Sequence, residues 1–267
     1  MAMLTTHLPA FLLCGLAAGL IAGMFGVGGG IIVVPALLFL FHLDGVDPLI
    51  AMQLAVGTSL ATIVITNISA TWAHHQRDGV NWRLARLYIS GTLIGAWIGS
   101  QLAAAMSGKL LIVLFGLFEI AVGIKMFRAR PQPSGARRLP DPLTPALGIV
   151  IGAISSLFGI GGGTLSVPSL TLLSGLPMRQ AVGTSSAIGV PLALIGALGF
   201  AHAGWDNPAL PDAALGFFHP LAFVGIVAGT LVTTRLGVRL AHALDPILLK
   251  KGFGLFLFVV GVKMILK

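Results

Sequence analysis

The chain has 267 residues, of which 56% are hydrophobic and only 9% are charged, and its mean hydropathy is +0.99. A soluble globular domain carries about 25% charged residues, so this composition excludes a soluble fold and identifies an integral membrane protein. The formal net charge of +8 is explained by basic loops on the cytoplasmic side of a membrane and predicts no nucleic-acid partner.

Apolar runs predict the membrane segments. They lie at about 8–25, 30–41, 48–73, 84–106, 110–127, 144–158, 163–174, 177–201, 215–240 and 246–266. A spanning helix needs about 20 residues, so the last three runs of each half are long enough to cross. The second run of each half is too short for this, and we predict a tilted or re-entrant half-helix there.

A polar, proline-rich stretch separates two halves of similar length. It extends from Arg128 to Thr144 and contains several arginines. We therefore predict a first transmembrane repeat at 1–127, a cytoplasmic linker at 128–143 and a second transmembrane repeat at 144–267.

The second half repeats the motifs of the first half in the same order. The first half contains Phe-Gly-Val-Gly-Gly-Gly a few residues before a proline, and the second half contains Phe-Gly-Ile-Gly-Gly-Gly a few residues before a proline. Each copy is followed further along by Ala-Val-Gly-Thr-Ser. The matched ranges are 25–35 with 158–168, 55–59 with 181–185, 115–118 with 253–256, and 122–126 with 260–264. This order predicts an internal duplication.

Loop charges predict that the two halves have opposite orientations. The connection 74–86 holds Arg77, Arg83 and Arg86, whereas its counterpart 202–216 holds two aspartates and no lysine or arginine. Basic loops stay in the cytoplasm, so the equivalent loops should lie on opposite sides. We predict an all-α polytopic membrane protein of two inverted-topology repeats, with broken or re-entrant helices at the glycine-rich motifs and about 8–10 membrane helical segments.

The two glycine clusters are the main candidates for a binding site. Successive glycines break a helix, and the helix that follows begins with free N–H groups and a partial positive charge that attract an anion. The predicted substrate-binding residues are Gly28, Gly29, Gly30 and Ile31 in the first half and Gly161, Gly162, Gly163 and Thr164 in the second. Close helix packing or a hinge is the alternative interpretation.

Hydroxyl groups recur at matched positions in the two halves. Thr58, Ser59, Thr184 and Ser185 could donate hydrogen bonds to an oxyanion. The alternative is that they bond the backbone of their own or a neighbouring helix.

Glu119 is the acidic residue placed well inside a predicted span, and it is a candidate for proton coupling, with a structural role as the alternative. The stripes Gly15-x₃-Gly19-x₃-Gly23 and Gly91-x₃-Gly95-x₃-Gly99 have the spacing of helix-packing surfaces. No paired carboxylates, Cys/His cluster or nucleophile–base pair stand out in the sequence. We therefore expect no enzyme activity, no metal and no cofactor.

With both glycine motifs and both Ala-Val-Gly-Thr-Ser motifs, nearly the whole chain resembles the sulfite exporter TauE/SafE family. The resemblance implies a multi-pass permease of the inner (cytoplasmic) membrane for sulfur-containing anions such as sulfite or organosulfonates. The hypothesis is an exporter that works by alternating access, with a small anionic substrate and the lipid bilayer as partners. The alternative functions are an anion channel, an uptake permease for another small organic anion and a non-transporting scaffold. A homodimer is a possible assembly.

Overall fold

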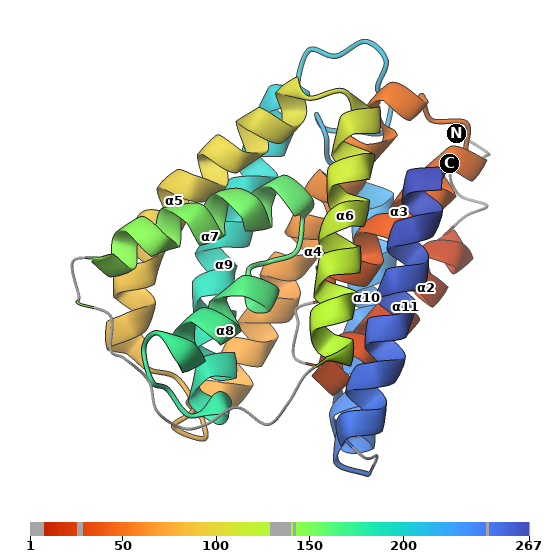
Figure 1. The fold of residues 1–267 in the computed structure, drawn as a ribbon. Helices are drawn as coiled ribbons and strands as arrows, with labels where there is room; N and C mark the ends of the chain where they lie inside the picture. Colours follow the sequence, from red (N-terminus) through yellow and green to blue (C-terminus); the bar gives the residue numbers. More distant parts are fainter. Residues whose placement is uncertain (1–7, 26–28, 129–139, 141–142, 244–245, 267) are drawn as a thin grey trace.

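The computed structural model describes residues 8–25, 29–128, 140, 143–243 and 246–266 (Figure 1). Across these residues the protein is all-helical and has no strand. The helices are α2 (Leu8–Phe25), α3 (Gly30–Leu43), α4 (Pro48–His75), α5 (Trp82–Ala105), α6 (Gly108–Phe127), α7 (Thr144–Phe158), α8 (Gly163–Leu172), α9 (Met178–Ala203), α10 (Pro220–Ala243) and α11 (Pro246–Leu266).

The helices confirm the predicted apolar runs, and local capping explains where they begin. The side chains of Asp47, Asn81 and Ser107 accept hydrogen bonds from the first turns of α4, α5 and α6. The largest difference is in the predicted run 215–240, because α10 begins only at Pro220. A proline suits the first turn of a helix, and the residues before it form a loop instead, in which Phe217 and His219 are buried and Leu215 is exposed.

The centre of the bundle is formed by α4, which is buried on all sides from Ile50 to Leu60. Helix α9 packs beside it and buries most of its small residues. A helix that is apolar around its whole circumference belongs in the interior of a bundle. The Ala-Val-Gly-Thr-Ser motifs lie on these two helices, so both copies are inside the protein.

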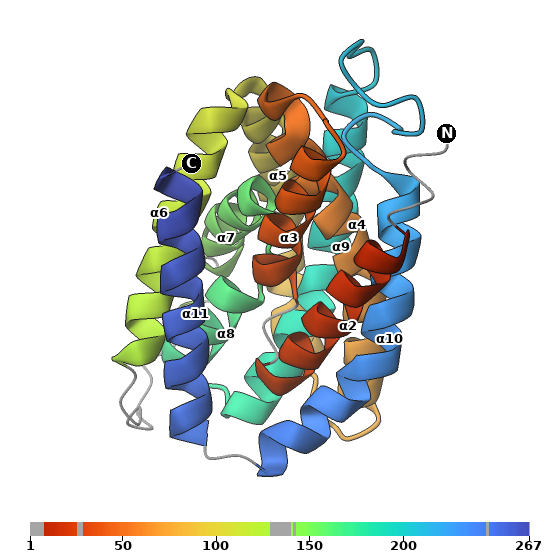
Figure 2. The same cartoon turned by 90° about the vertical axis from the view of Figure 1, so that its right-hand side faces the viewer.

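The two halves are interlocked. Helix α2 of the first half packs along α10 of the second, and α7 of the second packs along α5 of the first. Two further pairs join equivalent helices, α4 with α9 and α6 with α11, and α5 also packs on α9. Figure 1 shows the α5–α7 and α6–α11 pairs, and Figure 2 shows α2 along α10. The halves therefore share one bundle and are not two separate domains.

The glycine stripes are packing surfaces, as their spacing predicts. A Cβ atom on Gly91, Gly95 or Gly99 would collide with backbone atoms of α7, and one on Gly15 or Gly19 would collide with α10. Glycine lets two helix backbones come close together in a membrane. The stripes therefore fix the two pairs that connect the halves.

Helices α4, α6 and α9 are long and apolar enough to span a membrane. With 14 and 10 residues, α3 and α8 extend about 21 and 15 Å, less than the roughly 30 Å of a bilayer core. Large apolar side chains cover the outside of the bundle; Leu13, Trp72 and Val232 are 65%, 63% and 71% exposed. This is a polytopic membrane protein, and the opposite orientation of its halves stays a prediction from the loop charges.

Candidate functional site

The helices α3 and α8 begin with the same backbone geometry. Gly29 precedes α3 with φ 70° and ψ −27°, and Gly162 precedes α8 with φ 82° and ψ −22°. Both conformations are left-handed, which glycine adopts without steric cost. Each glycine carbonyl accepts hydrogen bonds from the third and fourth residues that follow it. The N–H groups of the first two residues of each helix have no acceptor within the helix and are available to a ligand.

The second glycine motif forms a loop that lies against the first motif. Gly159, Gly161 and Gly162 all have positive φ, and Gly159 caps the C-terminal end of α7. A Cβ atom on Gly30, the first residue of α3, would collide with the Gly159 carbonyl oxygen. The structure therefore brings the two glycine motifs together in the interior. Gly28 lies outside the described residues.

The Gly159 carbonyl also anchors the central helix. Ser59 Oγ on α4 donates a hydrogen bond to this oxygen at 2.9 Å. Further along α4, the Asn67 amide and the Gly161 carbonyl both border the space where a side chain on Gly189 would lie. Asn67 is 6% exposed. The sequence analysis did not select Asn67, although a polar amide inside an apolar run was a visible signal.

Four buried hydroxyls on α7 and α8, the helices that flank the second glycine loop, have no hydrogen-bond partner in the described structure. They are Ser155, Ser156, Thr164 and Ser166. Ser166 Oγ is 3.3 Å and Ser155 Oγ 3.8 Å from the position of a Cβ atom on Gly162, and Leu192 Cδ1 closes the same space at 3.2 Å. A buried, unpartnered hydroxyl costs about 1–3 kcal/mol, so the group is suited to a ligand that accepts hydrogen bonds.

The equivalent position at the start of α3 is apolar. Ala22 occupies the place of Ser155, with its Cβ atom 3.4 Å from the corresponding Cβ position on Gly29. Ile31 and Val33 occupy the places of Thr164 and Ser166, and both are buried. Of the two breaks, the one before α8 has the polar side chains that an anion site requires.

The matched threonines join the two halves to each other. Thr58 Oγ1 donates to the Leu54 carbonyl and accepts from the His219 N–H at 3.0 Å. Thr184 Oγ1 accepts from the Asn81 N–H at 2.9 Å. These hydrogen bonds fit the alternative interpretation, in which the threonine hydroxyls bond backbone groups of the protein and not a substrate.

The glycines before these threonines, and Ser185 after the second, complete this region. A Cβ atom on Gly57 would collide with the Phe217 carbonyl, and one on Gly183 would collide with the Gly79 carbonyl. Each motif therefore holds the loop that enters a long helix of the other half. Ser185 Oγ is buried without a partner and remains a candidate ligand.

Glu119 lies inside the bundle, where α6 crosses α11. Its carboxylate oxygens are buried and have no hydrogen-bond partner in the described structure, and its Cβ atom lies 3.2 Å from a Cβ position on Gly261. Its neighbour Phe118 packs on Phe158 with ring centroids 4.9 Å apart, and Phe158 precedes the Gly159 loop. The aromatic pair therefore packs α6, next to Glu119 in sequence, against the end of α7. Within the described residues, no three His, Cys, Asp or Glu side chains form a group that could hold a metal ion.

Broken helices that meet inside a bundle with an apolar outer surface define a polytopic membrane protein built as membrane transporters are. The chain belongs to the Sulfite exporter TauE/SafE family, which it matches over residues 11–264.

Several curated relatives carry the name "Probable membrane transporter protein". The chain is 35% identical to one from Haemophilus influenzae over 263 residues, which are 98% of this chain and 99% of the relative. It is 29% identical to one from Methanocaldococcus jannaschii over 276 residues (97% and 96%), and 31% identical to one from Xylella fastidiosa over 252 residues (92% and 90%). The family and these names indicate a membrane transporter rather than an enzyme.

Proposed function

We propose that this transporter exports small sulfur-containing anions, sulfite or an organosulfonate, across the inner membrane by alternating access. The observation that carries the proposal is the pair of buried, unpartnered hydroxyls of Ser155 and Ser166 at the start of α8. An oxyanion there would accept their hydrogen bonds and those of the Gly163 and Thr164 N–H groups. Hydrogen bonds to a charged partner contribute about 1.5–3 kcal/mol each.

Helix electrostatics favour an anion at the same place. The N-terminus of a helix carries roughly half a positive charge, and the N-terminus of α8 lies beside the hydroxyls of Ser155 and Ser166. The N-terminus of α3 lies against the same loop through Gly30 and Gly159, so its partial charge adds to the field. Such a site needs no lysine or arginine to attract an anion.

The membrane potential supports export. With the cell interior negative, outward movement of an anion is favourable by about 2.3 kcal/mol per charge per 100 mV. If a proton accompanies the anion, Glu119 is our candidate carrier, because its carboxyl group is buried between α6 and α11 and has no partner among the described residues.

Flux measurements on the purified protein in proteoliposomes would test this proposal. Vesicles are loaded with sulfite, a membrane potential or a pH gradient is imposed, and efflux is compared with that of protein-free vesicles. We expect efflux that saturates, follows the potential and exchanges against external sulfite. If the pH gradient drives efflux, Glu119→Gln should remove that dependence. Efflux without saturation or exchange would favour the channel alternative. Efflux of other organic anions but not of sulfur-containing ones would reject the proposed substrate.

A further inference from the structure

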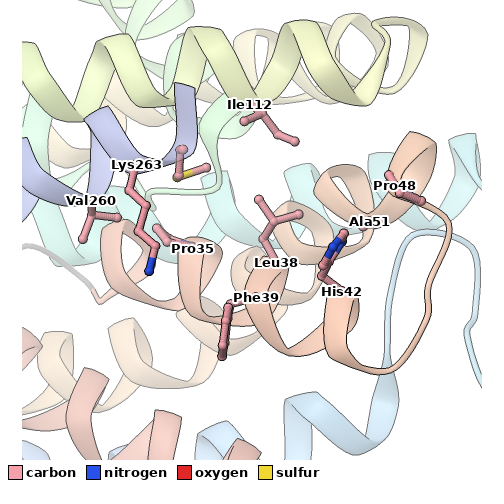
Figure 3. Close-up of a pocket in the computed structure, with 10 residues that line it drawn as sticks. Pro35, Leu38, Phe39, His42, Pro48, Ala51, Ile112, Val260 and Lys263 are labelled. Atoms are coloured by element: carbon pink, nitrogen blue, oxygen red, sulfur yellow. The ribbon is translucent and has the colours of Figure 1, made fainter. Parts of the chain in front are cut away.

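A cavity of about 470 Å³ lies between α3, α4, α6 and α11 and opens to the outside of the bundle, where Phe39, His42 and Lys263 are exposed; it is separate from the hydroxyls at the start of α8 (Figure 3). Its α3 wall consists of Pro35, Leu38, Phe39 and His42. None of the residues predicted to bind substrate lines this cavity.

The cavity follows one face of α3. Residues spaced by three and four positions lie on the same side of a helix, and 35, 38, 39 and 42 have this spacing. Ile31 is one turn before Pro35 on the same face, about 6 Å along the helix axis. The Pro35 end of the cavity is therefore about one turn from the N-terminus of α3, which packs on the Gly159 loop.

The polar groups of the cavity wall are cationic or neutral. Lys263 on α11 and His42 in the last turn of α3 contribute the nitrogen atoms, and none of the lining residues is acidic (Figure 3). A cation beside low-dielectric walls raises the local concentration of anions. The sequence offers a parallel, because Val260, Lys263 and Met264 recur on α6 as Val122, Lys125 and Met126.

We propose that this cavity is a second, weaker anion site on the transport path, at which Lys263 holds the anion between the α8 site and the end of the bundle where α3 ends. The inference rests on the proposed function and adds a binding site to it. The ligand is the transported oxyanion itself. The walls have no hydrogen-bonding hydroxyls, so the cavity attracts the charge of the anion without recognising its shape.

The test is exchange of external sulfite in proteoliposomes, measured as a function of sulfite concentration for wild type and Lys263→Gln. We expect the half-saturating concentration to rise about fivefold, the factor that one charge at about 4 Å contributes in water. The maximal rate should not change, and the difference should shrink at high ionic strength. Lys109→Gln is the matched control, because Lys109 is exposed at the adjoining end of α6 and does not line the cavity.

Three results would overturn the inference. An unchanged half-saturating concentration in Lys263→Gln would remove Lys263 from the path, and a reduced maximal rate alone would assign it a structural role. An effect seen only in vesicles that contain anionic phospholipid would mean that a lipid headgroup occupies the cavity. Absence of sulfite exchange in wild type is a different result, because it rejects the proposed substrate itself.

Discussion

Gly29 and Gly162 begin α3 and α8 with nearly the same backbone angles, yet different side chains surround them. Near Gly162 stand the hydroxyls of Ser155 and Ser166, and near Gly29 stands the methyl group of Ala22. The comparison shows that the two helix starts share a backbone geometry but differ in the chemistry of the side chains around them. A helix N-terminus supplies a positive field in both halves, but the second half also supplies hydroxyl donors.

The loops before α5 and α10 show the opposite pattern, because both geometry and role are kept there. Asn81 and His219 each donate a backbone N–H to a threonine of the other half. Each also caps its helix through the side chain, Asn81 by accepting from the Leu84 N–H and His219 by accepting from the Ala222 N–H. Where two halves must interlock, equivalent contacts are needed on both sides, whereas one substrate needs one polar site.

The largest difference between the halves is expected for Gly162→Ala against Gly29→Ala. Both variants place alanine in a left-handed conformation, which costs about 1–2 kcal/mol. At Gly162 the new methyl group would also lie 3.3 Å from Ser166 Oγ and 3.2 Å from Leu192 Cδ1, inside the proposed anion site. We expect sulfite flux at the protein-free level for Gly162→Ala and measurable flux for Gly29→Ala, both assayed at equal protein in the vesicles. Equal flux of the two variants would show that the breaks are functionally equivalent.

A smaller effect is expected at the matched threonines, on stability rather than on selectivity. Thr58→Val and Thr184→Val each leave a backbone N–H without its acceptor, which costs about 1–3 kcal/mol when the group is buried. The Thr58 bond is fully buried and the Thr184 bond partly buried, so Thr58→Val should lower the melting temperature more. Thermal unfolding in detergent would measure this. Ser90→Ala is a control, because its hydroxyl is exposed and bonds only its own helix. The reverse order, or no loss in either variant, would argue against the threonines as links between the halves.

Hydropathy and glycine placement were sufficient to predict the helices and the two breaks. The short second helices followed from counting residues, and the packing role of Gly91, Gly95 and Gly99 followed from their spacing. The exchange of partners between halves could not be predicted, because helix periodicity shows which face is buried but not which helix covers it.

Thr164 was among the residues that the sequence selected at the start of α8, and its role in binding stays a prediction. The start of α8 was selected for its glycines, but Ser155 was not, since a serine in a helix usually bonds its own backbone. Only the three-dimensional arrangement shows that this hydroxyl is buried without a partner among the described residues. Thr58 and Thr184 were selected as ligands or backbone partners, and their acceptor roles depend on loops distant in sequence.

The central claim is that the hydroxyls at α8 bind the anion, and the double variant Ser155→Ala/Ser166→Val tests it most directly. These substitutions give the second half the residues of the first, where Ala22 and Val33 occupy the same backbone positions. Thr171→Val on the same helix is the control, because the Thr171 hydroxyl donates to the Val167 carbonyl. The measurement is sulfite exchange against concentration in proteoliposomes. We predict that the half-saturating concentration rises at least about a hundredfold, since two hydrogen bonds of about 1.5–3 kcal/mol each to a charged ligand are lost, and that Thr171→Val matches wild type. A double variant with the wild-type concentration dependence would contradict the account.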